Sequence, residues 1–507
     1  MVSKIVSGAV IGVEGYLVDV EVDITQGLPS FDIVGLPDSS VKESRERVRS
    51  AIKNSDYPFP VKRITINLAP ADTKKEGPSF DLPIAIGILV SMDVISHKQI
   101  ENTFVTGELS LDGKIRPVTG VLPMIYNARK NNIKKCFVPF ENAEEAALVD
   151  GIEVYGVSSL HSLLEHLQSP KISPTLSISI KDSCEFYTDL DFSDVKGQES
   201  VKRALEVAAA GYHNLIMIGP PGSGKTMLAK RMPTILPNLN FEESINVTKI
   251  YSVVGMLENK ATLVTKRPFR APHHTISYAA LVGGGRTLRP GEISLAHNGV
   301  LFLDELTEFH KNVLEVLRQP LEDGYISIAR ANNSVVYPSD FMLLASMNPC
   351  PCGYYGDSDK CSCSPNEVSR YIGKISGPLL DRIDIQIEAL KVNYEELNYA
   401  KTSDSSETIR ERVQKAHTIQ RERFKNENIT YNSQLSAQQI QKYCPLGETE
   451  NMILKQVFDS LDLSARAYHK ILKLARTIAD LDAQENITPL HLTEAIQYRS
   501  LDRKYWS

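Results

Sequence analysis

The chain has 507 residues, with 56 basic and 62 acidic side chains and a formal net charge of −6. That length corresponds to about three domains, and the charge excludes a uniformly basic nucleic-acid coat protein while leaving room for local basic surfaces. No apolar run approaches the roughly 18 residues that a membrane-spanning helix needs, so no membrane partner is expected. Seven cysteines, an odd number in a long chain, predict reduced thiols and a cytoplasmic protein.

The first predicted region, residues 1–168, has the pattern of a mixed α/β domain. Apolar and polar residues alternate over residues 18–24 and 64–68, which predicts two half-buried strands. Residues 40–54, between them, predict a helix rich in lysine and arginine. This helix is a candidate DNA-binding surface, and an ordinary solvated helix face is the alternative interpretation. The candidate DNA contacts on it are Arg45 and Arg49.

The rest of the chain divides into three further parts. Residues 169–190 predict a linker, because Ser-Pro pairs and a serine-rich stretch interrupt any helical period. Residues 191–393 hold the phosphate-binding motifs described next, and residues 394–507 predict a helical lid domain. Within the lid, Ser436 followed by Gln439 predicts a capping box at the start of a helix.

A complete P-loop motif, Gly-Pro-Pro-Gly-Ser-Gly-Lys-Thr, occupies residues 219–226. The apolar residues 215–218 precede it as a strand and residues 227–230 continue as a helix, which is the context that the motif requires. Lys225 would reach the β- and γ-phosphates and Thr226 would ligate Mg²⁺, so ATP and Mg²⁺ are the expected cofactors. The predicted phosphate-binding residues are Gly219, Pro220, Pro221, Gly222, Ser223, Gly224, Lys225 and Thr226.

Two later strands bring polar side chains to the same predicted sheet edge. The apolar residues 300–303 end in Asp304 and Glu305, as expected of a buried parallel strand that delivers carboxylates to the ligand-binding edge. Asp304 would hold the Mg²⁺ shell and Glu305 would polarise the attacking water. The strand predicted at residues 341–346 is followed by Asn348, whose amide could orient that water or could simply be a turn residue.

Several segments resemble a known family. Residues 191–198 resemble the segment that leads into the core of AAA+ ATPases, which implies that Val195 and Gln198 border the adenine. Residues 267–275, Arg-Pro-Phe-Arg-Ala-Pro-His-His-Thr, and residues 348–353, Asn-Pro-Cys-Pro-Cys-Gly, resemble the Mg-chelatase-like ATPases of the ComM (YifB) family. This resemblance extends over nearly the whole chain.

Two arginines acquire roles from the resemblance. Residues 379–384 resemble the arginine-finger segment of the Mg-chelatase and minichromosome-maintenance branch, which implies that Arg382 acts on a neighbour's nucleotide. Residues 464–481 resemble the second sensor helix of that branch, which implies that Arg466 contacts the phosphates, either in its own subunit or across the interface. A surface salt bridge is the alternative interpretation of each arginine.

The family resemblance also implies an activity. It predicts an ATP-driven ring, a hexamer of identical chains, that binds single-stranded and branched DNA. The implied function is a DNA translocase or helicase that promotes branch migration of recombination intermediates in natural transformation. The first alternative is a Mg-chelatase-type remodeller acting on a protein or metal-insertion complex, and the second is an ATP-dependent protease.

Two insertions into the core are further candidate DNA contacts. A long stretch separates the P-loop from the acidic pair, which predicts an insertion at residues 250–285 that contains Arg270. Residues 325–337 predict a β-hairpin with Arg330 near its tip; in the related branch such a hairpin points into the ring's pore, although a plain surface hairpin is the alternative. The histidine pair at 273–274 lacks a third metal ligand nearby, so a structural role or substrate contact is expected.

The N-terminal region resembles the Lon protease domain, which has the ribosomal S5 domain 2-like fold. The resemblance rests on residues 76–79 and 106–117. Ser79 occupies the place of the Lon nucleophile, but Leu122 stands where the Lon-type lysine would be. Because a serine nucleophile needs a base, this domain is predicted to be proteolytically inactive, with Ser79 a helix-capping or turn residue.

The cysteine spacing predicts a metal site. The pattern is C-x-C-x8-C-x-C within a glycine-containing turn. Four soft ligands so close in sequence could hold Zn²⁺, and four reduced thiols are the alternative. The candidate zinc ligands are Cys350, Cys352, Cys361 and Cys363.

Overall fold

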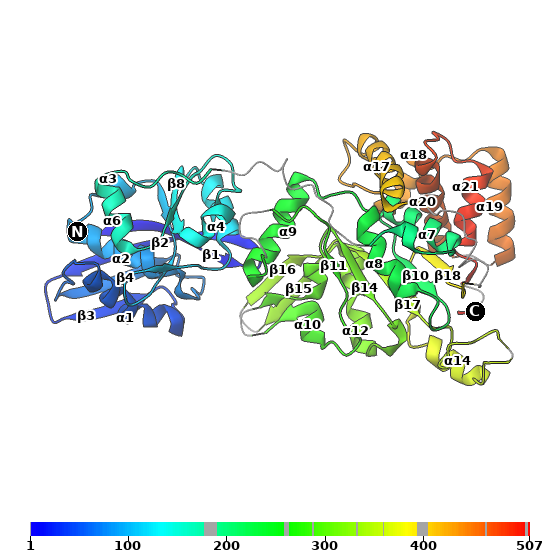
Figure 1. Cartoon of the computed structure of the whole chain (residues 1–507), viewed down its shortest axis with the longest axis horizontal. Coiled ribbons are helices and arrows are strands. Elements are labelled where there is room, and N and C mark those ends of the chain that lie inside the picture. The colour runs from blue at the N-terminus through cyan, green and yellow to red at the C-terminus, as the bar shows by residue number, and fades with distance from the viewer. Residues whose placement is uncertain are drawn as a thin grey trace. The chain divides into compact units, whose positions relative to one another are not determined.

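A computed structural model describes most of the chain, in two compact units (Figure 1). The described residues are 2–176, 190–257, 263–285, 288–330, 333–357, 359–392, 404–461, 464–501 and 505–506. Unit 1 comprises Met1–Cys184 and Phe241–Val264, and unit 2 comprises Glu185–Asn240 and Thr265–Ser507. The predicted boundary, which assigned all of residues 191–393 to the core, therefore differs from the structure at residues 241–264.

Unit 1 is built on a seven-stranded mixed sheet. The strands β1, β2 and β4 pair antiparallel and the others pair parallel. The alternating segments predicted at residues 18–24 and 64–68 are confirmed as parts of β2 and β4, in which Val18, Val20, Val22, Ile64, Ile66 and Leu68 are buried. In spatial order the strands are β3 (Ser30–Val34), β4 (Arg63–Ala69), β2 (Glu14–Thr25), β1 (Ser3–Ile11), β5 (Thr103–Val105), β8 (Lys135–Pro139) and β9 (Glu153–Val157).

Helices from distant parts of the chain complete unit 1. The predicted basic helix is confirmed as α1, with Asp38 as its N-cap. A small hairpin, β6 (Glu108–Leu109) with β7 (Ile115–Arg116), lies outside the main sheet. The helices are α1 (Ser39–Asn54), α2 (Asp81–Ser91), α3 (His97–Ile100), α4 (Val121–Lys130), α5 (Ala143–Ala146), α6 (Leu160–Gln168) and α9 (Phe241–Val254).

Helix α9 belongs to unit 1 because both apolar and polar contacts hold it there. Ile245 packs in the same buried cluster as Leu122 of α4. The Lys249 ammonium lies 4.1 Å from the centroid of the Tyr126 ring, at the distance of a cation–π contact. The Gly120 N–H donates to the carbonyl oxygen of Ser252 at 3.3 Å. The burial of α9 was not predicted, because its partners are far away in the sequence.

Unit 2 contains a five-stranded parallel sheet, as predicted for the core. Its three middle strands, at residues 215–218, 300–303 and 342–347, are short and entirely buried, which suits a sheet covered on both faces. The strand expected at residues 341–346 is confirmed with a shift of one residue. In spatial order the strands are β11 (Phe269–Arg270), β14 (Val300–Leu303), β17 (Met342–Met347), β10 (Leu215–Ile218) and β18 (Ile385–Glu388).

Several helices and two hairpins surround this sheet. The hairpin predicted at residues 325–337 is confirmed as β15 (Tyr325–Arg330) paired with β16 (Asn333–Pro338). A second small pair joins β12 (Gly283–Gly284) and β13 (Arg289–Pro290). The helices are α7 (Glu199–Gly211), α8 (Lys225–Ile235), α10 (Tyr278–Val282), α11 (Glu292–Leu295), α12 (Lys311–Val316), α13 (Arg318–Asp323), α14 (Pro365–Ile372) and α15 (Gly377–Leu380).

The C-terminal part of unit 2 is helical, as predicted. The capping box of Ser436 and Gln439 is confirmed at the start of α18. The buried face of α20 packs into the same core as the P-loop sheet. These helices are α17 (Ser406–Arg423), α18 (Ala437–Tyr443), α19 (Glu448–Leu461), α20 (Ala465–Leu481) and α21 (Pro489–Gln497).

Two sequence-based expectations fall partly outside the described residues. Of the predicted linker at 169–190, residues 169–176 form neither helix nor strand, and residues 177–189 lie outside the description. Residues 331–332, at the tip of the β15–β16 hairpin, also lie outside it. Within the described ranges, no helix is both long and apolar enough to cross a lipid bilayer.

Candidate functional site

The P-loop lies at the carboxyl end of β10 and leads into α8, and its lysine points back into the loop. The Lys225 ammonium donates to the carbonyl oxygens of Gly219 at 2.7 Å and Pro220 at 3.0 Å, and to Asn348 Oδ1 at 3.3 Å. Its residue is only 9% exposed, and burial lowers the pKa of Lys225, against the opposing charges of Asp304 and Glu305. This buried cation has neutral oxygens within hydrogen-bond distance and is placed to receive an anion.

Strand β14, which β17 separates from the P-loop strand, supplies both predicted carboxylates. Asp304 follows β14, and its Oδ2 accepts a hydrogen bond from Thr226 Oγ1 at 2.6 Å. Its Oδ1 accepts from the Ser346 hydroxyl of β17 and from the Glu305 N–H. A threonine hydroxyl beside a carboxylate is an oxygen donor set that suits Mg²⁺.

Glu305 has a partner that the sequence did not reveal. Its Oε2 lies 3.4 Å from Nδ1 of His274, which comes from the segment after β11. Glu305 also takes a left-handed backbone conformation, with φ of 53°. The His274 ring lies on the His273 ring at a centroid distance of 4.1 Å. The expectation of a structural or substrate-contact role for this histidine pair therefore becomes more specific, since His274 orients the candidate water-polarising carboxylate.

A pocket of about 500 Å³ opens beside the P-loop and collects several predicted residues. Gln198, in a left-handed conformation before α7, donates through Nε2 to the carbonyl oxygen of Ser223 at 3.2 Å. The buried Val195 contributes the apolar part. The predicted residues that line this pocket are Val195, Gln198, Pro221, Gly222, Ser223 and Gly224, joined by Asp194, Lys196, Met227, Lys391 and Val392.

The loop geometry fits a phosphate chain. Gly222 and Gly224 have positive φ values of 75° and 86°, which glycine adopts without strain. A Cβ on Gly222 would meet nothing within 4 Å, so this side of the loop is open. The buried Ser223 hydroxyl has no hydrogen-bond partner among the described residues. The accessible loop backbone, the unpaired Ser223 hydroxyl and the buried Lys225 together suit a nucleoside triphosphate.

The two predicted arginines lie at the other end of the sheet. The Arg382 carbonyl oxygen accepts from Asn214 Nδ2 at 2.9 Å, and Asn214 immediately precedes β10, whose opposite end carries the P-loop. Arg466 Nη1 lies 2.7 Å from Asp381 Oδ2 at the same edge. Because a strand rises about 3.3 Å per residue, β10 holds both arginines about 10 Å or more from their own P-loop.

Arg382 is held in place at that edge. Its guanidinium pairs with Glu322, and its Nη1 donates to the Pro378 carbonyl oxygen at 2.7 Å. Its side chain is 16% exposed, whereas that of Arg466 is 70% exposed. The two arginines thus belong to neighbouring segments at this edge, each with its own carboxylate partner, and the length of β10 separates this edge from the P-loop of the same chain.

The candidate DNA contacts are scattered over both units. On α1, the Arg45 side chain is half exposed, and the Arg49 guanidinium carbon lies 6.0 Å from the centroid of the Phe59 ring. Arg270 is engaged by Glu292 through two contacts of 2.6 and 2.7 Å. Arg330 ends β15, where it pairs through the backbone with Asn333. DNA contact by these four residues stays a prediction.

The four cysteines of the cysteine loop, which we define as residues 350–363, converge. The sulfur atoms of Cys350, Cys352, Cys361 and Cys363 all lie within 4.8 Å of one another. Among Cys350, Cys352 and Cys361 the sulfur separations are 3.3, 3.7 and 3.9 Å. A tetrahedral zinc with four Zn–S bonds of about 2.3 Å sets sulfurs about 3.8 Å apart. A hydrogen bond from the Tyr354 N–H lowers the pKa of Cys352 to about 6, so a thiolate forms there readily.

The Lon-like position of unit 1 looks different from the P-loop site. Ser79 lies in a 3₁₀ turn, Pro78–Phe80, directly before α2, so the expected turn role holds and a capping hydrogen bond is not observed. Leu122, at the predicted lysine position, is fully buried on α4. The backbone carbonyl of Ser79 accepts from the Gly107 N–H at 3.0 Å.

Sequence reasoning missed Ser346 and Lys391, and it singled out His274 without foreseeing its contact with Glu305. These residues come from segments whose place in the site depends on the order of the strands. Arg231 of α8 also matters, since its Nε donates to the Asp191 carbonyl at 2.6 Å and anchors the segment that leads into α7. The strand-terminal position of Ser346, parallel to the acidic strand, is a signal that could have identified it.

The strand order, with the P-loop strand flanked by β17 and β18 and followed in sequence by a helical lid, is that of a AAA+ ATPase. Family models agree along the chain. "Magnesium chelatase, subunit ChlI" matches residues 191–397, its C-terminal model matches residues 403–499, and "Subunit ChlI of Mg-chelatase" matches residues 20–142.

Comparison with individual proteins shows which family of AAA+ ATPases the chain resembles. Competence protein ComM of Haemophilus influenzae is 43% identical over 98% of this chain and 97% of its own length. The uncharacterized protein YifB of Escherichia coli is 42% identical over 98% and 96%. Lon protease 2 of Bacillus subtilis is 33% identical over 30% of each chain. The chain belongs to the ComM/YifB family of Mg-chelatase-like AAA+ ATPases, for which ATP and Mg²⁺ are the expected ligands.

Proposed function

We propose that this protein is a cytoplasmic, hexameric ring ATPase that translocates on DNA and promotes branch migration of recombination intermediates in natural transformation. One observation supports assembly into a ring: Arg382 and Arg466 lie at the sheet edge opposite the P-loop of their own chain. An arginine that stabilises the γ-phosphoryl must lie beside it, so these two need a neighbouring subunit's nucleotide. The relative named Competence protein ComM supports the DNA-uptake setting.

The residues of the ATP site divide the work of hydrolysis among them. ATP supplies the phosphoryl group, and Mg²⁺ supplies positive charge at its β- and γ-oxygens. Lys225 and the loop N–H groups bind the phosphates, while Thr226 and Asp304 offer the metal ligands. Glu305, oriented by His274, accepts a hydrogen bond from the attacking water and so polarises it. Asn348 positions that water from the end of the β17 strand.

The arginine pair completes each site across the subunit interface. Arg466 pairs with Asp381, the residue directly before Arg382. We infer from this pairing that Arg466, like Arg382, acts on a neighbouring subunit's nucleotide. Glu322 must release Arg382 when the interface forms, since the same guanidinium cannot hold Glu322 and face the γ-phosphoryl at once.

We place DNA at the two basic features. The β15–β16 hairpin, with Arg330 at the end of its first strand, is a two-stranded sheet separate from the core sheet, and we propose that it lines the pore as the hairpins of the related branch do. Arg45 and Arg49 expose charge on α1 of unit 1. Phosphate contacts of this kind make DNA binding dependent on salt rather than on sequence.

We also propose that the cysteine loop holds one Zn²⁺. The support is the convergence of four sulfurs at the spacing of a tetrahedral thiolate site. Four reduced thiols, the alternative, would need no such convergence.

A Mg-chelatase-type remodeller remains the second candidate function, because the family models that match the chain describe a magnesium chelatase subunit. ATPase activity measured with no DNA, single-stranded DNA, duplex DNA and a four-way junction separates the two. The translocase predicts at least severalfold stimulation by DNA and ATP-dependent movement of the junction. A rate unaffected by every DNA, with no junction movement, would contradict the translocase and favour the remodeller.

A further inference from the structure

The cysteine loop is joined to the ATP site at its first residues. Asn348, whose Oδ1 accepts from the Lys225 ammonium at 3.3 Å, comes two positions before Cys350. Cys350 is fully buried, so the loop starts inside the domain and not at its surface. Any movement of the first cysteine is therefore transmitted through one proline to the side chain that contacts Lys225.

The loop also packs directly on the P-loop. Gly353 has a φ of 85°, and a Cβ at this position would lie 2.5 Å from Cδ of Pro221. Real Cβ atoms do not approach other atoms so closely, so only glycine permits this contact. Pro221 also lines the nucleotide pocket. The Pro220–Pro221 segment thus lies between the nucleotide pocket and the cysteine loop.

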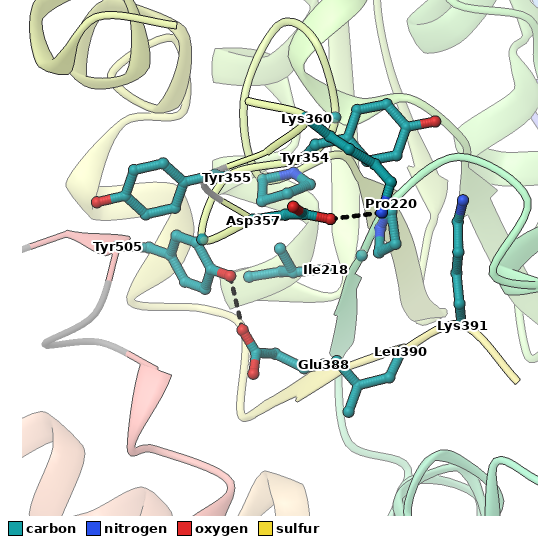
Figure 2. A pocket seen from close by; sticks show the side chains of 14 residues that line it. Ile218, Pro220, Tyr354, Tyr355, Asp357, Lys360, Glu388, Leu390, Lys391 and Tyr505 are labelled. Carbon is teal, nitrogen blue, oxygen red and sulfur yellow. Dashed lines mark hydrogen bonds and ion pairs between the residues drawn. The ribbon is translucent and has the colours of Figure 1, made fainter. Parts of the chain in front are cut away.

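A second pocket, of about 430 Å³, shows the same arrangement (Figure 2). Its lining combines loop residues that lie between the two cysteine pairs with Ile218, which ends β10, and with Gly219 and Pro220 of the P-loop. Asp357 and Lys360 form an ion pair of 2.8 Å within the cysteine loop. The loop residues concerned are Gly353, Tyr354, Tyr355, Gly356, Asp357 and Lys360.

Among the described residues of this loop, the thiols bring its two ends together, while Tyr354 and Tyr355 contact Lys391 and Tyr505 outside it. Its described residues form neither helix nor strand, and the backbone hydrogen bonds recorded within it are local, such as Cys361 N–H to the Asp357 carbonyl at 2.8 Å. Such a loop has a large conformational entropy unless it is cross-linked. The four sulfurs bring its beginning and its end together, and a bound metal would make that closure permanent.

We propose that zinc in the cysteine loop is a structural metal of the ATP site: it holds the loop against Pro221 and thereby positions Asn348 and the P-loop for hydrolysis. This inference rests on the proposed zinc site. All four sulfurs complete the tetrahedral shell of the metal, which leaves no open position for water or substrate. The metal therefore takes no part in the reaction. The cysteines act through Asn348 and Pro221 and are positioning residues.

The expected effect is on turnover more than on folding. A misplacement of about 1 Å in a catalytic group can cost about a hundredfold in rate. Loss of the metal would free the loop, and with it two contacts of the ATP site: the position of Asn348 and the packing of Gly353 on Pro221. We therefore expect kcat/KM for ATP to fall about tenfold or more, with kcat falling more than KM rises, since Lys225 and the loop N–H groups still bind phosphate.

The test uses the full-length chain and three variants. Cys352→Ser removes a metal ligand, Gly353→Ala keeps all four thiols but disturbs the contact with Pro221, and Ser362→Ala changes an exposed residue between two ligands as the control. Zinc content is measured by elemental analysis, and Co²⁺-loaded protein is examined for the absorption bands of tetrahedral thiolate coordination. Circular dichroism and thermal melting report folding, and ATPase assays at saturating Mg²⁺ report kcat and KM.

The expected pattern is specific. Wild type and Ser362→Ala carry about one zinc with full turnover; Cys352→Ser loses zinc and turnover; Gly353→Ala keeps zinc but loses turnover. Full turnover in a folded, zinc-free Cys352→Ser protein would overturn the positioning inference, while the proposal that the wild type binds zinc would still stand. A wild type without zinc and without the Co²⁺ bands would overturn the zinc site itself. If Cys352→Ser fails to fold, Gly353→Ala decides alone: zinc retained with unchanged kcat contradicts the inference.

Discussion

One cation in each unit shows a different use of charge. In unit 1, the partly exposed Arg47 of α1 binds the fully buried Asp81 through contacts of 2.6 and 3.0 Å; this carboxylate raises the pKa of Arg47, while burial raises the pKa of Asp81. In unit 2, the buried Lys225 has neutral oxygens of the P-loop and of Asn348 within hydrogen-bond distance, and burial lowers its pKa. Arg47 offsets the cost of burying the Asp81 charge, whereas Lys225, held among neutral oxygens, is placed to receive an anionic ligand.

Helix α1 carries Arg47 between the two candidate DNA contacts, Arg45 and Arg49, and its sequence alone does not distinguish the three arginines. The structure separates Arg47 from the other two, because its guanidinium is committed to Asp81 inside unit 1. Removal of Arg47 would therefore test folding and not DNA binding.

The largest expected effect concerns Arg382, at the edge opposite the P-loop. Arg382→Ala should bind ATP nearly normally but hydrolyse it about 10³-fold more slowly, because an arginine finger stabilises transition-state charge. Mixing Arg382→Ala with Glu305→Gln should recover ATPase activity, since some interfaces then pair an intact Glu305 with an intact Arg382.

The controls for this experiment are assembly and charge. Sedimentation must show that both variants form rings, and Arg370→Ala, which removes an exposed arginine of α14, should leave turnover unchanged. If mixing recovers no activity although mixed rings form, Arg382 serves its own subunit and the ring argument is wrong.

The second effect concerns Glu305, next to His274. Glu305→Gln should keep ATP affinity within a few fold and lower turnover by about 10² to 10⁴, because only polarisation of the water is lost. Lys225→Ala should instead weaken ATP binding itself. Nucleotide binding measured by fluorescence and turnover measured by phosphate release separate the two. Equal losses of affinity in both variants would contradict the division of roles.

The third effect tests the paired cation of unit 1. Arg47→Ala leaves Asp81 buried without its partner, which should cost about 3 kcal/mol or more of the free energy of unfolding. Urea denaturation of the full chain measures it, and ATPase activity without denaturant should persist. Lys42→Ala, an exposed change on the same helix, is the control and should cost under about 0.5 kcal/mol. An equal cost for both variants would mean that the buried pair contributes little.

A smaller effect is expected for the exposed arginines of α1. The double variant Arg45→Gln with Arg49→Gln should weaken DNA binding and reduce the slope of log affinity against log salt by about one to two. Lys98→Gln with Lys134→Gln removes the same charge from exposed positions elsewhere on unit 1 as a control. An unchanged slope in the arginine variant would remove α1 from the DNA-binding surface.

The smallest effect is expected at Ser79. Ser79→Ala should leave ATPase and DNA-dependent activities unchanged, because the turn at Pro78–Phe80 uses the Ser79 carbonyl, which the variant retains. Peptide-cleavage assays should find no activity to lose. If the wild type cleaves peptides and Ser79→Ala abolishes it, unit 1 is a protease despite Leu122.

Local motifs account for what could be predicted. The P-loop, the acidic strand end and the β15–β16 hairpin depend on residues within a few positions of each other, so their spacing alone predicts them. The capping box at Ser436 is equally local. Contacts such as His274 with Glu305 were not predictable, because they depend on which strands become neighbours in the sheet.

The sequence by itself determined the chemistry of this protein: a lysine and threonine for phosphate and metal, two carboxylates, and four clustered thiols, since side-chain identity and short spacing carry that information. Only the tertiary structure decided where these groups act. It moved residues 241–264 into unit 1, committed Arg47 to Asp81, and separated Arg382 from its own P-loop. The physical reason is that burial and strand order depend on packing between segments far apart in the chain, which no local pattern encodes.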